Sequence, residues 1–218
     1  MSDPCKQDLT SSEIKKILLV EGNNDCHLVM GLCKKQNVTE NFRIHDCNGI
    51  DKALKILNSL IARPDPPEVI GAVLDADKSI MTQWNRIQKK LQDYDYNFPQ
   101  NPTINGTIIQ GYEDKPKLGF WLMPNNIDAG IVEDFCIELV PQNRQDTFRF
   151  AQECVAEAKN RKLTDFKDQD YSKAELCTYL AWQDEPGFPP GKAIGTKKLN
   201  ADAELAKHFT DWLKQLFG

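Results

Sequence analysis

The chain has 218 residues, of which 40% are hydrophobic and 27% are charged, and its formal net charge is −5 at pH 7. A chain of this length and composition can bury the core of one globular domain without disulfide bonds or metal ions. Its net negative charge excludes binding to nucleic acid by bulk positive charge. A local basic patch or a bridging Mg²⁺ is still compatible with that balance. No long apolar run predicts a membrane span and the polar start, residues 1–10, is unlike a signal peptide, so we expect a cytoplasmic protein.

Seven cysteines are scattered along the chain, and none of them is spaced as C-x-x-C. An odd number without that spacing argues against a disulfide framework and against a cysteine-type zinc site. We therefore expect reduced thiols.

The first half of the chain alternates between strand and helix patterns. Short apolar runs with β-branched residues predict buried strands, and apolar residues at helical spacing predict amphipathic helices. Strands are expected at residues 16–21, 42–47 and 69–75, and helices at residues 26–36, 50–62 and 79–94. Asp25 or Asn24 is a candidate cap for the first helix, and Ser79 for the third. This alternation predicts parallel pairing with crossover helices, and so an α/β fold with a mostly parallel sheet between helices.

The second half of the chain is mainly helical. Two further strands are expected at residues 107–112 and 117–124, followed by helices at residues 131–140, 147–162, 171–183 and 201–217. The stretch PGFPPGKAIG, residues 186–195, is predicted to be an ordered loop or a mobile flap. No linker marks a boundary, so we expect one domain over residues 1–218, with a core at about 14–140 and a helical C-terminal extension at about 141–218.

Two of the predicted core strands end in an acid. Glu21 ends the first strand, Asp75 ends the third, and Asp77 follows in the stretch LDAD. Ligands of open α/β sheets bind beyond the carboxyl ends of the strands, so these carboxylates are expected to converge there. One such acid is usually a cap or a solvated loop residue, but two strands that end this way favour a site. Carboxylates that lie close together raise one another's pKa, and a bound Mg²⁺ removes that cost and polarises phosphoryl oxygens.

The stretches VEGNND (residues 20–25) and LDAD (residues 74–77) resemble the E-G-x-x-D and D-x-D signatures of the Toprim domain. That domain is shared by topoisomerases, bacterial primases, overcoming-lysogenization-defect (OLD) nucleases and small rRNA-maturation nucleases. The order of strands and helices is similar over about residues 16–95, which implies a Toprim or Rossmann-like sheet. The stretch GFWLMPNNIDAGIVEDFC, residues 119–136, is similar to a standalone group of bacterial Toprim-like proteins of unknown function. Asn125 stands where an aspartate is also common in that group.

The resemblance implies a role for each matching acid. Glu21 matches the general acid/base, which also touches a metal in OLD-like nucleases, and Asp75 and Asp77 match the aspartates that bind Mg²⁺ or Mn²⁺. Asp25 matches the aspartate of the first motif, with a mixed structural and metal-supporting role. Glu133 resembles an extra acid that supplies a second metal in the OLD-like branch, although an acid is also simply favoured at the start of a helix.

Glycine, amide and lysine residues complete the predicted site. Gly22 permits close approach of the backbone and Asn126 lies in the second matching turn, and both are expected to contact substrate. A cation would offset the charge of a phosphoryl-transfer transition state. Lys173 is the candidate by analogy with a late lysine of OLD-like nucleases, and Lys78 and Lys192 compete with it. Taken alone, each lysine fits a solvated surface position better.

The expected function is Mg²⁺- or Mn²⁺-dependent phosphoryl transfer, most simply by a nuclease that cleaves DNA or RNA. Topoisomerase and primase activities need a tyrosine-bearing partner domain, or zinc and helicase-binding parts, that this sequence does not show. The alternative is a non-catalytic Toprim-like module that binds a nucleotide, nucleic acid or protein and acts with a separate ATPase. The sequence is also compatible with a homodimer. A phosphatase or receiver-like domain would need a nucleophilic aspartate after the first strand, where this chain has Glu21.

Overall fold

The computed structural model describes residues 4–6, 9, 11 and 13–218, and the polar start that we compared with a signal peptide lies largely outside them. One five-stranded sheet forms the centre, with the strand order β2-β1-β3-β5-β4. The strands are β1 (Lys16–Val20), β2 (Arg43–Asp46), β3 (Val69–Asp75), β4 (Thr107–Ile109) and β5 (Lys117–Met123).

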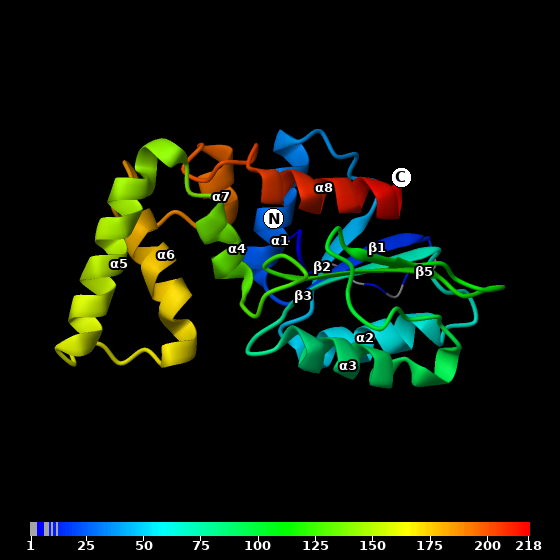
Figure 1. Ribbon diagram of the computed structural model, residues 1–218. Helices are drawn as coiled ribbons and strands as arrows, with labels where there is room; N and C mark the ends of the chain where they lie inside the picture. Colours follow the sequence, from blue (N-terminus) through cyan, green and yellow to red (C-terminus); the bar gives the residue numbers. More distant parts are fainter. Residues whose placement is uncertain (1–3, 7–8, 10, 12) are drawn as a thin grey trace.

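Helices cover both faces of this sheet (Figure 1). The α-helices of the described residues are α1 (Asn23–Lys35), α2 (Ile50–Ile61), α3 (Ile80–Lys90), α4 (Val132–Glu138), α5 (Gln145–Asn160), α6 (Tyr171–Ala181), α7 (Pro190–Gly195) and α8 (Glu204–Phe217). Short 3-10 turns are η1 (Gln92–Tyr94), η2 (Gln142–Arg144) and η3 (Asp168–Asp170). In Figure 1, α2 and α3 lie below the sheet and α8 lies above it, and residues of α1 and α4 share one core with α8.

The strand directions follow from the crossover connections. β1 pairs in parallel with both β2 and β3, and β3 pairs in parallel with β5. Only the short edge strand β4 runs antiparallel among the described strands. The predicted α/β fold, with a mostly parallel sheet between helices and a helix at the C-terminal end, is confirmed.

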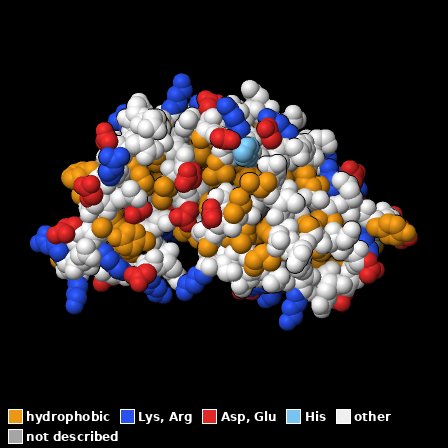
Figure 2. All heavy atoms as spheres, viewed as in Figure 1, with side chains coloured by type: hydrophobic (Ala, Val, Ile, Leu, Met, Phe, Trp, Pro, Cys, Tyr) orange, Lys and Arg blue, Asp and Glu red, His pale blue; other side chains and the backbone are white. Residues whose placement is uncertain are grey.

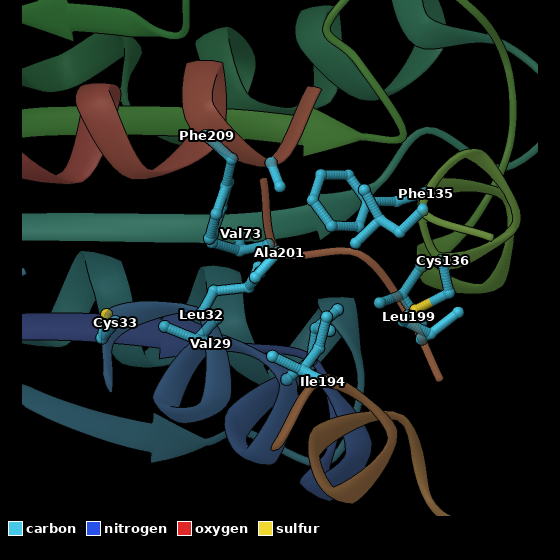
Figure 3. Close-up of a cluster of buried hydrophobic side chains, with 14 of the residues drawn as sticks. Val29, Leu32, Cys33, Val73, Phe135, Cys136, Ile194, Leu199, Ala201 and Phe209 are labelled. Atoms are coloured by element: carbon cyan, nitrogen blue, oxygen red, sulfur yellow. The ribbon is translucent and has the colours of Figure 1, made fainter. Parts of the chain in front are cut away.

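Alternating side chains of the strands enter two separate cores. Leu18 and Val20 of β1 belong to the core on the side of α1 and α8, and Ile17 and Leu19 belong to the core on the side of α2 and α3. A continuous apolar strand of this kind is the pattern of a sheet that is buried on both faces. Figure 3 shows how helices distant in sequence share the first core, with labelled side chains that include Val29, Leu32, Phe135, Ile194 and Phe209.

The last helix completes the core on one face of the sheet. α8 packs against β3 and β5 and buries an apolar stripe that contains Phe209, Trp212 and Leu216. A Cβ atom on Gly119 would lie 2.7 Å from Leu216 Cδ1, so glycine in β5 permits this close approach. The region that we expected to be an extension, residues 141–218, therefore also supplies part of the central core.

Two helices of that region form an arm that projects beyond the end of the sheet. α5 and α6 pack against each other, and α6 also packs against α4 (Figure 1). The rings of Phe150 in α5 and Trp182, just after α6, pack on the outside of the arm in a tilted arrangement, with centroids 5.5 Å apart. The arm thus reaches the sheet through α4, which follows β5 in the chain.

Two local predictions are corrected by the structure. The stretch at residues 186–195 contains helix α7 rather than a loop, because Pro190 occupies the first helical turn and Gly191 lets α7 pack directly on the His27 backbone of α1. The first helix begins at Asn23 with Gly22 as its N-cap, so neither Asp25 nor Asn24 caps it. Ser79 does cap α3, since its hydroxyl oxygen accepts a hydrogen bond from the Thr82 N–H group at 3.2 Å.

The expectation of reduced thiols is wrong for one pair of cysteines. Cys5 and Cys26 form a disulfide whose Cα atoms lie 6.1 Å apart. The pairing depends on tertiary structure, because the Cys5 carbonyl oxygen accepts a hydrogen bond from the Asp46 N–H group at the end of β2. Spacing along the chain gives no sign of that contact.

Within the described part of the chain, every helix is too short or too polar to span a bilayer.

Candidate functional site

The ends of β1 and β3 bring two predicted site residues into direct contact. Val20 is paired with Val73 in the parallel register, so Glu21 lies beside the end of β3. The Asp75 N–H group donates a hydrogen bond of 2.8 Å to Glu21 Oε1. A second backbone N–H group, that of Ile50 at the start of α2, also stabilises the Glu21 carboxylate. The acid of the first motif is therefore fixed across two neighbouring strands.

Asp75 is held in turn by the start of α4. Its Oδ1 atom accepts a hydrogen bond of 2.9 Å from the Val132 N–H group, in the first turn of that helix. The next residue, Glu133, is buried and faces the same acidic group closely enough to raise the pKa of Asp75. The predicted acids from the β3 end and from α4 thus lie together.

The spacing of the E-G-x-x-D motif has a packing explanation. Gly22 precedes the first turn of α1, and Asp25 lies within that turn with only 6% of its surface exposed. A Cβ atom on Gly22 would lie 3.1 Å from Asp25 Oδ2, so a side chain here would press on the buried carboxylate. Gly22 therefore makes room for Asp25.

Burial and mutual repulsion raise the pKa of three carboxyl groups. Burial is the largest cause for Glu21, whose raised pKa is partly offset by its backbone hydrogen bonds. The pKa of Asp25 is raised to about 7, first by burial and then by the charges of Glu21 and Glu133. The pKa of Asp75 is raised to about 9 by burial and then by the charges of Glu21, Asp25, Glu133 and Asp77. Five predicted acids are thus within electrostatic reach of one another, and a cation among them would relieve the repulsion.

Asp77 is fixed by contacts that the sequence did not suggest. Its backbone is left-handed, with φ of 50°, and its N–H group donates a 2.9 Å hydrogen bond to the Gly130 carbonyl oxygen. Its Oδ2 atom accepts a 2.7 Å hydrogen bond from Nε2 of Gln83 in α3. A left-handed aspartate is strained by roughly 1–2 kcal/mol, which these two contacts offset. Gln83 carries no motif signal, because a single amide six residues after an aspartate is unremarkable.

Three of these acids, Asp75, Asp77 and Glu133, line a cleft between the sheet and the arm, whereas Glu21 and Asp25 are not among its lining residues. The cleft has a volume of about 910 Å³, and Asp75, Asp77, Gln83 and Glu133 form one side of it. Residues of η3 and the start of α6 also line the cleft, so the helical half of the chain faces Asp75, Asp77 and Glu133. In Figure 2 this region is the notch between the arm and the sheet-bearing body, and Lys and Arg side chains border it.

Three lysines contribute to the cleft lining. Lys78 follows the D-x-D motif directly, and Lys167 and Lys173 come from the segment around η3 and α6. The Lys173 ammonium nitrogen lies 3.6 Å from Glu133 Oε1, and the neighbouring Ser172 hydroxyl donates to Asp134. These two contacts tie the arm to α4. Lys167 lies between predicted helices, where the sequence offered no reason to choose it.

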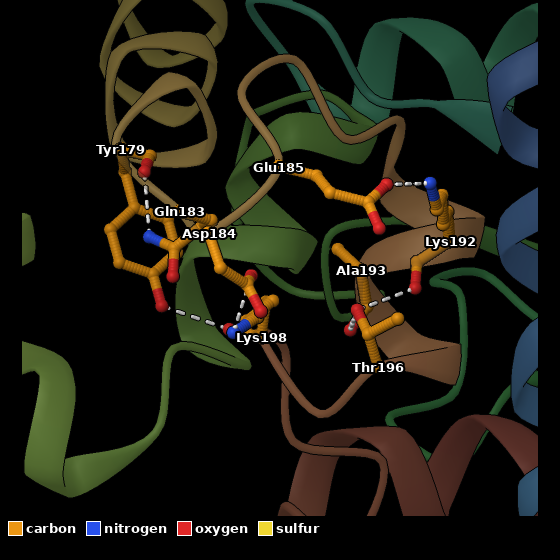
Figure 4. A network of polar contacts seen from close by, with 8 residues as sticks. All are labelled: Tyr179, Gln183, Asp184, Glu185, Lys192, Ala193, Thr196 and Lys198. Carbon is orange, nitrogen blue, oxygen red and sulfur yellow. Dashed lines mark hydrogen bonds and ion pairs between the residues drawn. The ribbon is translucent and has the colours of Figure 1, made fainter.

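Two predicted residues lie away from both the cleft lining and the other acids. Lys192 forms an ion pair with Glu185 and lies over the Phe188 ring, in a polar network on and around α7 (Figure 4). Asn126 holds a turn: its Oδ1 atom accepts from the Leu122 N–H group at 2.7 Å, and its amide donates to the Ile104 carbonyl oxygen. The structure gives both residues structural contacts and does not bring them to the acids.

The donor chemistry of the cleft fits a hard divalent cation. Carboxylate oxygens are the ligands that Mg²⁺ and Mn²⁺ prefer, and five such groups surround this edge of the sheet. Gln83 Oε1 is a buried acceptor without a hydrogen-bond partner among the described residues, which also suits a site that gains a ligand. In the part of the chain that the structure describes, no three Asp, Glu, His or Cys side chains are already spaced to hold a metal ion. The carboxylates would therefore have to close around the ion on binding.

Comparison with known proteins gives one family match. A family described as a protein of unknown function, DUF3226, matches residues 15–218. No curated protein and no solved structure matches the chain.

Proposed function

The chain belongs to the DUF3226 family of unknown function, and we propose that it is a Mg²⁺- or Mn²⁺-dependent phosphodiester hydrolase that acts on nucleic acid. The observation that carries this proposal is the contact between Glu21 and Asp75 at the ends of adjacent parallel strands, where Asp75 lines a cleft together with Asp77 and Glu133. Acids of this number are costly without a cation. The Toprim-like order of the E-G-x-x-D and D-x-D motifs supports the same proposal.

The acids divide between two tasks. Asp75 and Asp77 would hold the metal, and Glu133 and Asp25 would complete or support its coordination. When bound, Mg²⁺ or Mn²⁺ would polarise a phosphoryl oxygen and lower the pKa of an attacking water. Glu21 is the candidate general acid/base, because its raised pKa brings it closer to the range in which a carboxyl can both accept and donate a proton.

The lysines of the cleft would bind the phosphate groups of the substrate. Lys167 and Lys78 lie on the cleft lining with Lys173, and the same lining includes Asp75, Asp77 and Glu133. An ammonium group contacts phosphate as a point charge and positions a strand without reading its sequence. We therefore propose that a nucleic-acid backbone enters between the arm and the sheet, with the scissile phosphate over the acids.

The test is cleavage of labelled single- and double-stranded DNA and RNA oligonucleotides, with Mg²⁺, with Mn²⁺ and with EDTA. Wild type is compared with Glu21→Gln and Asp75→Asn, and with Asp211→Asn as a charge-matched control on the exposed surface of α8. We expect metal-dependent cleavage by wild type and by the control, and its loss in both site variants. Cleavage that survives both site substitutions would contradict this assignment of the site.

The non-catalytic alternative makes a different prediction in the same experiment. A Toprim-like module that works with a separate ATPase would bind Mn²⁺ or an oligonucleotide and cleave none of the substrates. Binding is therefore measured alongside cleavage, by isothermal titration with Mn²⁺ and by fluorescence anisotropy with the oligonucleotides. Binding that depends on Asp75, without turnover, would favour the module over the hydrolase.

A further inference from the structure

Gln83 is a buried amide side chain at the edge of the cleft. It lies in the first turns of α3, only 7% of its surface is exposed, and it is part of the cleft lining together with Asp75 and Asp77. Its Nε2 group donates to Asp77 Oδ2 at 2.7 Å. Its Oε1 atom is buried and has no hydrogen-bond partner within the described residues. A buried amide oxygen without a partner is costly, so its presence beside a candidate site calls for a donor that a ligand brings.

The contact to Asp77 restricts one carboxylate of the cluster to one orientation. The Asp77 backbone is fixed because its N–H group donates to the Gly130 carbonyl oxygen and its φ angle is 50°. Asp77 is an exposed residue on a loop, and Gln83 fixes its side chain by holding Oδ2. The other carboxylate oxygen of Asp77 keeps its full capacity to bind a cation.

We propose that Gln83 is a positioning residue of the metal site, whose N–H group orients Asp77 and whose carbonyl oxygen accepts a hydrogen bond from a water molecule bound to Mg²⁺ or Mn²⁺. The inference rests on the proposed function, because it takes Asp77 as a metal ligand. An amide suits both tasks, since it offers a donor to a carboxylate and an acceptor to a metal-bound water. Hydrogen bonds to ligand side chains fix their orientation and raise metal affinity.

A purely structural role for Gln83 predicts a different result. If the amide only joins α3 to the preceding loop, its loss would destabilise the fold and leave the affinity of the folded protein for a metal ion unchanged. If Gln83 orients Asp77, its loss weakens metal binding by about 10- to 100-fold, the range found for residues that support metal ligands. Metal affinity measured well below the unfolding temperature separates the two roles.

The experiment is titration of the full chain with Mn²⁺ alone, followed by the electron paramagnetic resonance signal of the free ion. Gln83→Met removes both polar groups at nearly constant volume, and Gln83→Leu is a second variant in case the first does not fold. Gln88→Met is the matched control: Gln88 lies on the same helix, and its amide donates a 3.0 Å hydrogen bond to the Pro99 carbonyl oxygen. Circular dichroism and thermal unfolding without metal confirm that each variant is folded.

We expect the dissociation constant for Mn²⁺ to rise about tenfold or more in Gln83→Met and to stay within about twofold of wild type in Gln88→Met. In an Asp77→Asn background, Gln83→Met should add little further loss, because both substitutions disable the same ligand. Equal affinity of wild type and both Gln83 variants would overturn the positioning role and leave the proposed function intact. Absence of Mn²⁺ binding by wild type would overturn the metal site itself, and the role of Gln83 with it.

Discussion

The Asp75 backbone N–H group donates a hydrogen bond to the Glu21 carboxylate, so the acids that end β1 and β3 form one connected unit. The contact stabilises the charged form of Glu21 and, at the same time, places that charge beside the side chain of Asp75. One hydrogen bond thus creates both the order of the site and its electrostatic repulsion. The repulsion has measurable consequences in the protein without metal.

Without metal, the free energy of unfolding should fall as pH rises from about 4 to about 9. The pKa of Asp25 is raised to about 7 and that of Asp75 to about 9 in the folded protein. A carboxyl with a raised pKa binds its proton more tightly in the folded state, so each increase in pH above the unfolded pKa favours unfolding. Chemical unfolding followed across this pH range in EDTA measures the slope, and saturating Mn²⁺ should flatten it.

Asp75→Asn should reduce this pH dependence and stabilise the metal-free protein at pH 8. Folding at pH 8 requires Asp75 to bind a proton, because its pKa is about 9 in the folded protein and far lower in the unfolded chain. Asparagine is neutral without that proton, and its amide oxygen can still accept the hydrogen bond from Val132. We expect a gain of roughly 1–3 kcal/mol in the free energy of unfolding, together with loss of stabilisation by Mn²⁺. Asp211→Asn is the control, since it removes an exposed carboxylate and should change neither quantity. A metal-free Asp75→Asn protein less stable than wild type at pH 8 would contradict the repulsion.

Glu21→Gln should lower the cleavage rate more than it lowers metal affinity. A general acid/base contributes about 10²- to 10⁴-fold to a rate, and glutamine keeps the acceptor oxygen for the Asp75 N–H group while losing the proton-transfer function. Single-turnover cleavage with Mn²⁺, together with direct Mn²⁺ titration, separates the two effects. If affinity and rate fall in parallel, Glu21 is primarily a metal ligand rather than the acid/base.

The two lysines contributed by the arm should act differently. Lys173 lies 3.6 Å from Glu133, beside the acids, and Lys173→Met should reduce the cleavage rate about 10²-fold through loss of charge stabilisation in the transition state. Lys167 lines the cleft on the same segment, before η3. Lys167→Met should mainly weaken substrate binding and reduce the slope of log affinity against log salt by about 0.7 for a single strand.

Lys214→Met on α8 provides the control for both lysine variants, because Lys214 pairs with Asp211 at 3.0 Å outside the cleft lining. Its salt slope and cleavage rate should equal those of wild type. An equal reduction of the salt slope in Lys167→Met and Lys214→Met would mean that the substrate does not use this cleft.

The parts of the site that the sequence predicted are those that follow from strand order. Glu21 and Asp75 end apolar strands, and parallel strands expose their carboxyl ends at one edge, so their meeting was predictable. Gln83 and Lys167 were not predictable, because each reaches the cleft through tertiary packing of a helix or a turn that leaves no periodic signal. The disulfide of Cys5 escaped prediction for the same reason.

The fold shows the same division between local pattern and tertiary packing. Strands and helices with clear periodicity were predicted near their observed positions. Helix α7 was not predicted, because a Pro- and Gly-rich stretch is typical of a loop and the packing of α7 against α1 is a tertiary contact. The sequence also gave no means to see that α8, distant from the motifs, packs back over β3 and β5.

The packing of α8 against β3 and β5 leads to a prediction about stability away from the site. Gly119→Ala places a methyl group within 2.7 Å of Leu216 Cδ1, in a core where the side chain of Leu216 is fully buried. Overpacking of this kind costs about 1–3 kcal/mol, and it should lower the midpoint of urea unfolding with little change in slope. Gly195→Ala is the matched control, because a Cβ atom there meets no atom within 4 Å. If the two alanine variants are equally stable, then α8 does not pack on β5 as described, and residues 141–218 are an appendage rather than part of the core.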